Sequence, residues 1–298
     1  MDNFPGFTWG LMYPFCRLAG LIPYIPKTDL NFYLRYKWQI YSSLHVILII
    51  FWHLECYVSI TYYFDKAELL PLVFTFLDFL SYPLSAMYGL LLILIKGPKI
   101  YSILELLSKI VSQDLSNVKM SQTKILFIES CYYYFISQFL INIFVLYWVI
   151  NLEPFFLSLN FFYFLYGNNE LLLMDLNFCV FVVNIRQGFQ NLNFEILNNK
   201  GKGKVEFLKD LQRLRKIYQE LCDVVSSVEK CFLDLITLST AAEFTGLVFS
   251  SYLALHKPSA LNILLLYYWA SFFIMKMVFK IYVCFSTTKE VNMIIINP

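Results

Sequence analysis

The sequence predicts an all-α integral membrane protein with six transmembrane helices, and three observations lead to this fold class. Hydrophobic residues make up 59% of the 298 residues and charged residues only 15%, whereas about a quarter of the residues in a soluble domain are charged. The mean hydropathy is +0.60. Six apolar stretches also exceed the ~20 residues that a helix needs to cross about 30 Å of hydrocarbon.

The chain divides into membrane-spanning parts and polar parts. Residues 40–185 hold the first four spans and residues 233–285 the last two, which are expected at 40–61, 69–95, 125–150, 155–185, 233–255 and 261–285. A Pro/Gly-broken segment precedes them, a loop with one long helix separates the two sets, and a short end follows, at residues 1–39, 186–232 and 286–298.

Basic residues alternate between the predicted loops. Lys and Arg number four in residues 1–39, five in residues 96–124 and nine in residues 186–232. The loops between these contain only Lys66 and Lys257. Because positive charge accumulates on cytoplasmic loops, this alternation predicts a cytoplasmic N-terminus, a cytoplasmic helix between the fourth and fifth spans, and a cytoplasmic end after the sixth.

The long helix in residues 207–232 is the most charged helical pattern in the chain. Its apolar residues recur at alternating steps of three and four, which is typical of a helix that packs lengthwise against another. This seam is expected to hold the cytoplasmic helix against its neighbours and across subunits, and it consists of Leu211, Leu214, Tyr218, Leu221, Val225, Val228 and Phe232.

Patterns for catalysis, metal binding and nucleic-acid binding do not occur in the sequence. The three His are scattered, and the seven Cys form neither a CxxC pair nor a Cys/His cluster. We therefore expect no enzyme activity, no metal and no cofactor. The net charge of +2 is too small to indicate nucleic acid.

His45 and His53, with Glu55 nearby, could suggest a proton relay, but such a relay normally continues on a facing helix that the sequence does not reveal.

Polar residues within the predicted spans are informative, because a charge at the bilayer centre costs at least ~2.5 kcal/mol. Within the spans, cations occur only near the inner end of the sixth, at Lys276 and Lys280. As a set, the polar residues predict a cavity or ion path, although each could instead pair with another or mark a kink. They are Asp78, Asn142, Asn168, Asn169, Glu170, Asp175 and Glu243.

Aromatic residues gather in the predicted outer halves of the spans. Together with a few polar groups they could line a pocket for a small organic ligand, or they could form an interfacial belt. The candidate ligand-binding residues are Asp78, Tyr82, Asn142, Trp148, Tyr163, Tyr166, Glu243, Tyr267 and Tyr268.

Three stretches resemble the insect gustatory receptor family. The charged helix reads LxxLRxxYxxLCxxVxxVxxxF from Leu211 to Phe232, YPFCRLAGLIPY (residues 13–24) is similar to the family's N-terminal segment, and CFSTTKEVN (residues 284–292) is similar to the segment after its sixth span. The resemblance implies a tastant-detecting, ligand-gated cation channel of the plasma membrane, in contact with lipid and assembled as a homo- or hetero-tetramer. The family has a seventh span, and this chain stops at Pro298, so a truncated, non-conducting form is also expected.

Other receptor and transporter classes fit the sequence less well. Insect odorant receptors share the predicted topology and remain an alternative. A G-protein-coupled receptor would have an external N-terminus, and the sequence lacks both Asp-Arg-Tyr after the third span and a late Asn-Pro-x-x-Tyr. A secondary transporter would contain inverted repeats with broken helices, which are not found.

Overall fold

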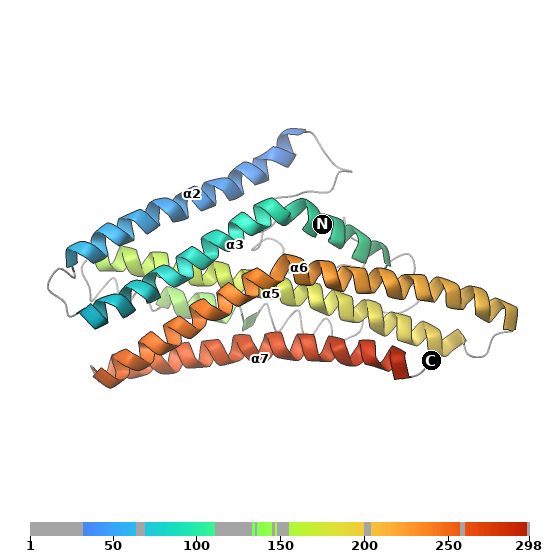
Figure 1. The fold of residues 1–298 in the computed structure, drawn as a ribbon. Helices are drawn as coiled ribbons and strands as arrows, with labels where there is room; N and C mark the ends of the chain where they lie inside the picture. Colours follow the sequence, from blue (N-terminus) through green and yellow to red (C-terminus); the bar gives the residue numbers. More distant parts are fainter. Residues whose placement is uncertain are drawn as a thin grey trace.

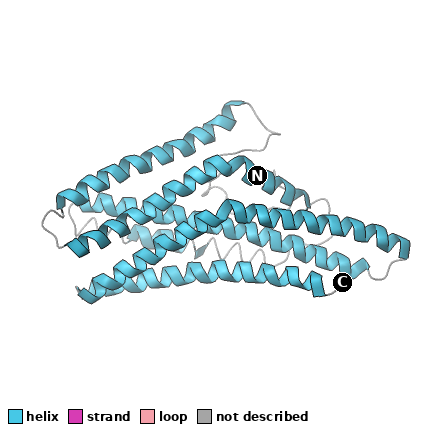
Figure 2. Cartoon of the chain, in the orientation of Figure 1, coloured by secondary structure: helices cyan, strands magenta, loops and turns pink. Residues whose placement is uncertain are grey.

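A computed structural model describes residues 32–63, 69–110, 133–134, 136–144, 147, 155–199, 204–256 and 260–296. Throughout this part of the chain the backbone is helical (Figure 2). The five long helices lie roughly lengthwise in one elongated bundle (Figure 1). They are α2 (Phe32–Tyr63), α3 (Leu69–Lys109), α5 (Phe155–Asn199), α6 (Lys204–His256) and α7 (Ala260–Ile296).

The predicted spans at 40–61, 69–95, 155–185, 233–255 and 261–285 each fall within one of these helices. The predicted third span, 125–150, lies mostly outside the described residues, and its described parts are helical. By length and composition, three stretches of the described chain could cross a membrane: Leu165–Asn198, Leu208–Tyr252 and Leu266–Asn292. The all-helical membrane fold is confirmed at this level, whereas six spans and a cytoplasmic N-terminus remain predictions.

All five long helices extend beyond the predicted spans, and three of them, α5, α6 and α7, include segments that were predicted as separate polar parts. α6 joins the charged helix and the predicted fifth span without a break at residue 232, because no Gly or Pro interrupts the chain between Lys204 and Gly246. α5 continues beyond residue 185 to Asn199, and α7 continues through the predicted short end to Ile296. The polar segments are therefore extensions of membrane helices.

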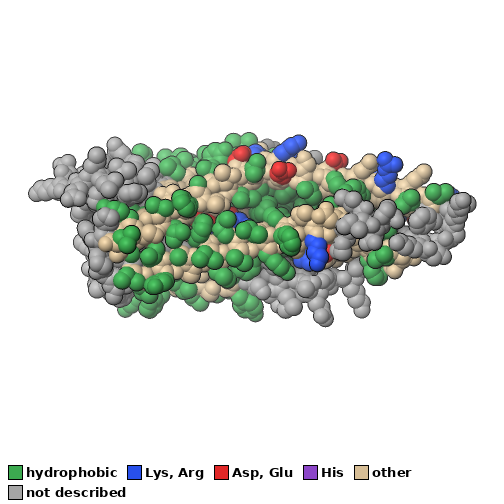
Figure 3. Space-filling model, turned by 60° about the horizontal axis from the view of Figure 1, so that its bottom comes forward, with side chains coloured by type: hydrophobic (Ala, Val, Ile, Leu, Met, Phe, Trp, Pro, Cys, Tyr) green, Lys and Arg blue, Asp and Glu red, His purple; other side chains and the backbone are tan. Residues whose placement is uncertain are grey.

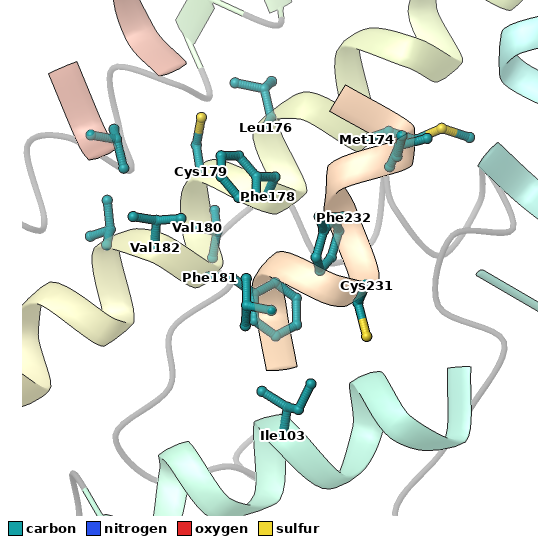
Figure 4. Packing of buried hydrophobic residues seen from close by; sticks show 14 of the residues in the cluster. Ile103, Met174, Leu176, Phe178, Cys179, Val180, Phe181, Val182, Cys231 and Phe232 are labelled. Carbon is teal, nitrogen blue, oxygen red and sulfur yellow. The ribbon is translucent and has the colours of Figure 1, made fainter. Parts of the chain in front are cut away.

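α5 is the central helix of the bundle, and it packs against α3, α6 and α7. Nearly every described side chain from Leu165 to Leu192 is buried, which is the behaviour of a helix that is covered on all sides. Figure 4 shows part of this core, where the ring of Phe232 on α6 lies 5.8 Å from Phe178 and 5.3 Å from Phe181 on α5, measured between centroids. Ile103 of α3 approaches the same cluster.

The outer surface of the bundle is largely apolar. In the space-filling view hydrophobic side chains cover most of the visible described surface, and charged side chains show at only a few places (Figure 3). Ile47 and Phe51 of α2 and Val278 and Phe285 of α7 are among the exposed large hydrophobics. A surface of this kind requires an apolar environment, and a lipid bilayer supplies one.

α5 and α3 approach each other closely at Gly167. A Cβ atom at this position would lie 3.0 Å from the backbone N and 3.1 Å from the Cα of Pro83. Main-chain atoms within a packed helix cannot rotate aside as a side chain does, so the crossing requires a residue without a side chain.

We therefore expect Gly167→Val to lower the free energy of unfolding by roughly 1–3 kcal/mol through overpacking. Gly188→Val is the matched control, because the three atoms nearest to a Cβ there all belong to the Leu221 side chain, with Cδ2 at 2.8 Å, and a rotamer change can move them. Thermal unfolding of both variants in lipid nanodiscs measures the difference. An equal loss of stability in the two would contradict this account of the crossing.

Candidate functional site

Four charged side chains meet in the interior where α5, α6 and α7 come together. Lys276 of α7 contacts Glu243 of α6, and its Nζ lies 3.0 Å from Oδ2 of Asp175 on α5. Lys280, one turn further along α7, places Nζ 3.3 Å from the same Asp175 oxygen and 3.8 Å from Oε2 of Glu243. All four side chains are at most 8% exposed. We call these residues the charge quartet.

Hydroxyl groups and one aromatic ring surround the charge quartet. Ser239 Oγ lies 2.8 Å from Asp175 Oδ2 and 3.1 Å from Glu243 Oε1, and its single hydrogen can bond to one of them at a time. Lys280 Nζ lies 3.4 Å from Thr240 Oγ1. The Nζ atom of Lys276 also lies 5.1 Å from the ring centroid of Phe272, which is within cation–π range.

The quartet is electrically neutral, because two lysines face two carboxylates. Removing one member of a buried pair leaves an uncompensated charge and is strongly destabilising, whereas the intact pair contributes little net stability. The quartet therefore fixes how α7 sits against α5 and α6. The sequence left two interpretations open for Asp175 and Glu243: that they line a cavity, or that they pair with other polar groups. The structure shows that both are paired.

A second network of uncharged groups joins the predicted third span to α5 and α7. Asn142 Nδ2 donates to Asn169 Oδ1 at 2.9 Å, and the Tyr268 hydroxyl donates to Asn142 Oδ1 at 2.6 Å. Gln138 Oε1 lies 3.4 Å from the same hydroxyl. The structure thus brings together Asn142 and Tyr268, two candidate ligand-binding residues from distant parts of the sequence. We call this group, with Asn169 and Gln138, the amide network.

Asn168 is adjacent to the amide network in sequence and is fully buried. Neither its side-chain nitrogen nor its side-chain oxygen has a hydrogen-bond partner within the described part of the chain. Each buried amide group without a hydrogen-bond partner lowers the stability of the fold by about 1–3 kcal/mol. Such a side chain is therefore typical of a place where a water molecule or a ligand supplies the partners.

A third polar contact links α2 to α5. His45 Nδ1 lies 2.5 Å from the Tyr166 hydroxyl and 4.0 Å from Glu170 Oε1. The relay considered from the sequence involved His53 and Glu55, whose side chains lie outside the described residues. The facing-helix partners that the sequence could not reveal are Tyr166 and Glu170, four residues apart on α5.

The remaining candidate ligand-binding residues lie in different environments. Tyr82 is fully buried on α3, whereas Tyr267 is 71% exposed and turns away from its neighbour Tyr268. Glu243 belongs to the charge quartet. The side chains of Asp78, Trp148 and Tyr163 lie outside the described residues.

The seam of the predicted cytoplasmic helix, in the N-terminal part of α6, has a buried side and an exposed side. Leu214, Leu221, Val228 and Phe232 are buried, and Tyr218 is partly buried, with its ring 6.0 Å from that of Phe189 on α5. Leu211 and Val225 are exposed. Much of the seam therefore packs on α5 of the same chain, and two of its members remain free of that contact.

A polar anchor that was not predicted from the sequence joins the C-terminal parts of α5 and α7. Gln190 Nε2 donates to Glu290 Oε1 at 2.8 Å, and Asn193 Nδ2 donates to the Glu290 main-chain carbonyl at 3.0 Å. Arg186 lies 3.8 Å from the Glu290 carboxylate. If the helical period is continued beyond residue 286, Glu290 falls on the same face as Val283. The sixth span was expected to end at residue 285, so this position of Glu290 was not predicted.

An apolar helical bundle with neutralised buried charges defines an integral membrane protein. A family model described as 7tm chemosensory receptor matches residues 10–294, and the chain therefore belongs to this chemosensory receptor family. The resemblance to insect chemoreceptors is confirmed at the level of the family, and the gustatory or odorant branch remains a prediction.

Among solved structures, the insect olfactory receptor OR5 from Machilis hrabei is similar in fold. It aligns with a TM-score of 0.70 at 12% sequence identity, covering 94% of this chain and 79% of that chain. At this identity the likeness shows the fold alone. No curated protein sequence matches this chain significantly.

We expect Lys276→Met to lower the free energy of unfolding by roughly 3–5 kcal/mol, because it leaves two carboxylates facing one lysine. The double variant Lys276→Met/Glu243→Gln should recover part of this loss, since the charges then balance again. Thermal unfolding in lipid nanodiscs measures both effects. Lys216→Met is the control, because Lys216 is 78% exposed beside Glu220 and should change stability by less than about 1 kcal/mol. If the stability loss of the double variant equals the sum of the losses of Lys276→Met and Glu243→Gln, the two side chains do not interact and the charge quartet is contradicted.

Proposed function

We propose that the chain is a gustatory receptor subunit of the plasma membrane, that it forms part of a ligand-gated cation channel detecting a small-molecule tastant, and that it is not an enzyme. The family match over residues 10–294 is the observation that carries the proposal. The topology that goes with it is six spans with a cytoplasmic N-terminus, for which the alternation of basic loops is the support.

The amide network, with Asn168, is the proposed ligand site. Ligand pockets are mostly apolar and contain a few polar groups that fix the orientation of the ligand. Here Asn142 and Tyr268 supply amide and hydroxyl groups, and Asn168 has both a donor and an acceptor without a described protein partner. These groups carry no net charge, so they suit a neutral ligand that both donates and accepts hydrogen bonds.

Assembly into a homo- or hetero-tetramer is proposed to use the inner parts of α5 and α6. This is the region that the basic-loop pattern assigns to the cytoplasm, where exposed apolar side chains are unfavourable in water. Leu208, Leu211 and Val225 of α6 and Phe194 and Leu197 of α5 are exposed there. Contact with neighbouring subunits would cover them.

An odorant receptor subunit is the second candidate function. The solved structure that supports it is an insect olfactory receptor with the same fold. Both functions use the same ligand site and assembly surface, and the class of ligand that opens the channel separates them.

Removal of one hydrogen bond in the amide network is expected to change the ligand response. In cells that express the receptor with partner subunits, responses to a panel of sugars, bitter compounds, carbon dioxide and volatile odorants are recorded first as currents. Tyr268→Phe then removes the hydroxyl that donates to Asn142 and should shift the half-maximal concentration roughly fivefold, as expected for a hydrogen bond worth about 1 kcal/mol.

Tyr267→Phe is the matched control for that experiment. Its side chain is adjacent in sequence but exposed, so its dose response should equal that of the wild type. Unchanged dose responses for both Tyr268→Phe and Asn142→Ala would remove the proposed ligand site. A wild-type receptor that reaches the cell surface and gives no current to any class in the panel would contradict the channel function.

Leu211→Asp is expected to reduce the fraction of oligomer severalfold while leaving the fold of each subunit intact, because Leu211 is exposed. Leu221→Asp is the contrasting variant, because Leu221 is fully buried against Gly188 and a charge there should lower the unfolding temperature instead. Mass photometry measures oligomer size and thermal unfolding measures stability. Wild-type oligomer size for Leu211→Asp would count against assembly through this surface.

A further inference from the structure

The contact between α2 and α5 contains a buried carboxylate whose charge is not balanced as in the charge quartet. Asp175 and Glu243 each lie close to Lys276 and Lys280. The side chain of Glu170 is only 4% exposed, and among the described residues its one basic neighbour within 4.0 Å is His45. A carboxylate in an apolar interior requires a counter-charge or a proton.

The geometry around His45 connects it to both α5 residues. His45 Nδ1 lies 2.5 Å from the Tyr166 hydroxyl and 4.0 Å from Glu170 Oε1, while Glu170 Oε2 has no hydrogen-bond partner in the described part of the chain. The His45 side chain is 16% exposed, so water can deliver a proton to this contact from the side of the imidazole.

Few other ionisable groups face this contact from the helices packed around it. α2 adds Tyr41, whose ring centroid is 4.6 Å from that of His45, and α5 adds Tyr166. On α3, the main chain of Tyr82 lies next to Gly167 of α5 and the Tyr82 side chain is buried, while the side chain of Asp78 lies outside the described residues. Asp175 is five positions after Glu170, about 140° around α5, and faces the quartet.

We propose that His45 and Glu170 form a proton-binding site between α2 and α5, and that proton uptake draws α2 onto the bundle. The proton comes from water and binds the imidazole, so no other reactant is needed. The imidazolium and the carboxylate then form an ion pair, whose attraction is several times stronger at low dielectric than in bulk water. Tyr166 holds the imidazole in place through its hydroxyl.

Loss of the proton reverses this attraction. A neutral imidazole leaves the Glu170 carboxylate without a counter-charge, and separation of α2 from α5 then lets water reach it. In strong acid Glu170 is also neutral and the ion pair is again lost, so the contact is tightest at intermediate acidity. The site would make the receptor responsive to acid, and it does not depend on the proposed ligand site.

Spin-label distances between α2 and α5 test the proposal in the full chain, reconstituted in lipid nanodiscs with the seven native cysteines replaced by alanine. Labels are attached at Ile47→Cys and Leu197→Cys, both exposed positions. The ratio of the close to the distant population is expected to be roughly tenfold larger at about pH 6 than at about pH 8.5, on either side of the usual range of histidine titration.

Three variants at the site give distinct outcomes. Glu170→Gln and His45→Gln should each show the same distances at both pH values. His45→Gln should also increase the distant population, because it leaves the Glu170 carboxylate without a counter-charge at both pH values. His45→Lys keeps a cation at both pH values and should remain close throughout, which gives a readout even where a glutamine variant does not fold. Glu195→Gln is the matched control, because this α5 carboxylate pairs with Arg213 instead, and it should behave as the wild type.

Distances that do not change with pH in the wild-type background would overturn the proposal. A pH response retained in both Glu170→Gln and His45→Gln would also overturn it. So would a response that is lost in Asp78→Asn and kept in Glu170→Gln, because Asp78 would then be the titrating group.

Discussion

Neutralisation of charge inside an apolar bundle is the constraint on which the rest of this structure depends. Two lysines of α7 meet one carboxylate from α5 and one from α6, and all four side chains are buried. Separation of any one helix would leave charges in an apolar medium, which is far less favourable than the loss of an apolar contact. The quartet therefore fixes the rotation and the axial position of α7 together, because its lysines are one turn apart on a single face.

α5 contributes to the charge quartet, to the amide network and to the contact with His45. Glu170 faces α2, Asn169 faces the predicted third span, and Asp175 faces α6 and α7. Successive faces of one helix thus carry different polar partners, which is possible only for a helix that is covered on all sides. The proposed roles follow this division. The uncharged amide network binds a ligand, the charge quartet fixes the position of α7, and the titratable contact between His45 and Glu170 controls the position of α2.

The fold is shared with an insect olfactory receptor at 12% identity, and a membrane protein can tolerate such divergence for a physical reason. Apolar side chains of similar volume replace one another in a helical interior with small losses of stability, so the bundle does not require particular residues at most positions. The proposed functional roles rest on the few polar groups that the bundle encloses, and such groups can differ between proteins that share an architecture.

The sequence by itself determined that the chain is helical, that it belongs in a membrane and roughly where most spans lie, because apolar run length and helical period are local properties. It also identified Asn142, Asp175 and Glu243 as polar groups within the spans, and Tyr268 as a candidate ligand-binding residue. Only the tertiary structure decided the partners: Lys280 lies 105 residues after Asp175 and reaches it through the crossing of α5 and α7. The tertiary structure also decided that Tyr268 turns inward and Tyr267 outward. Neighbouring positions on a helix point about 100° apart, and packing against other helices decides which of the two faces the interior.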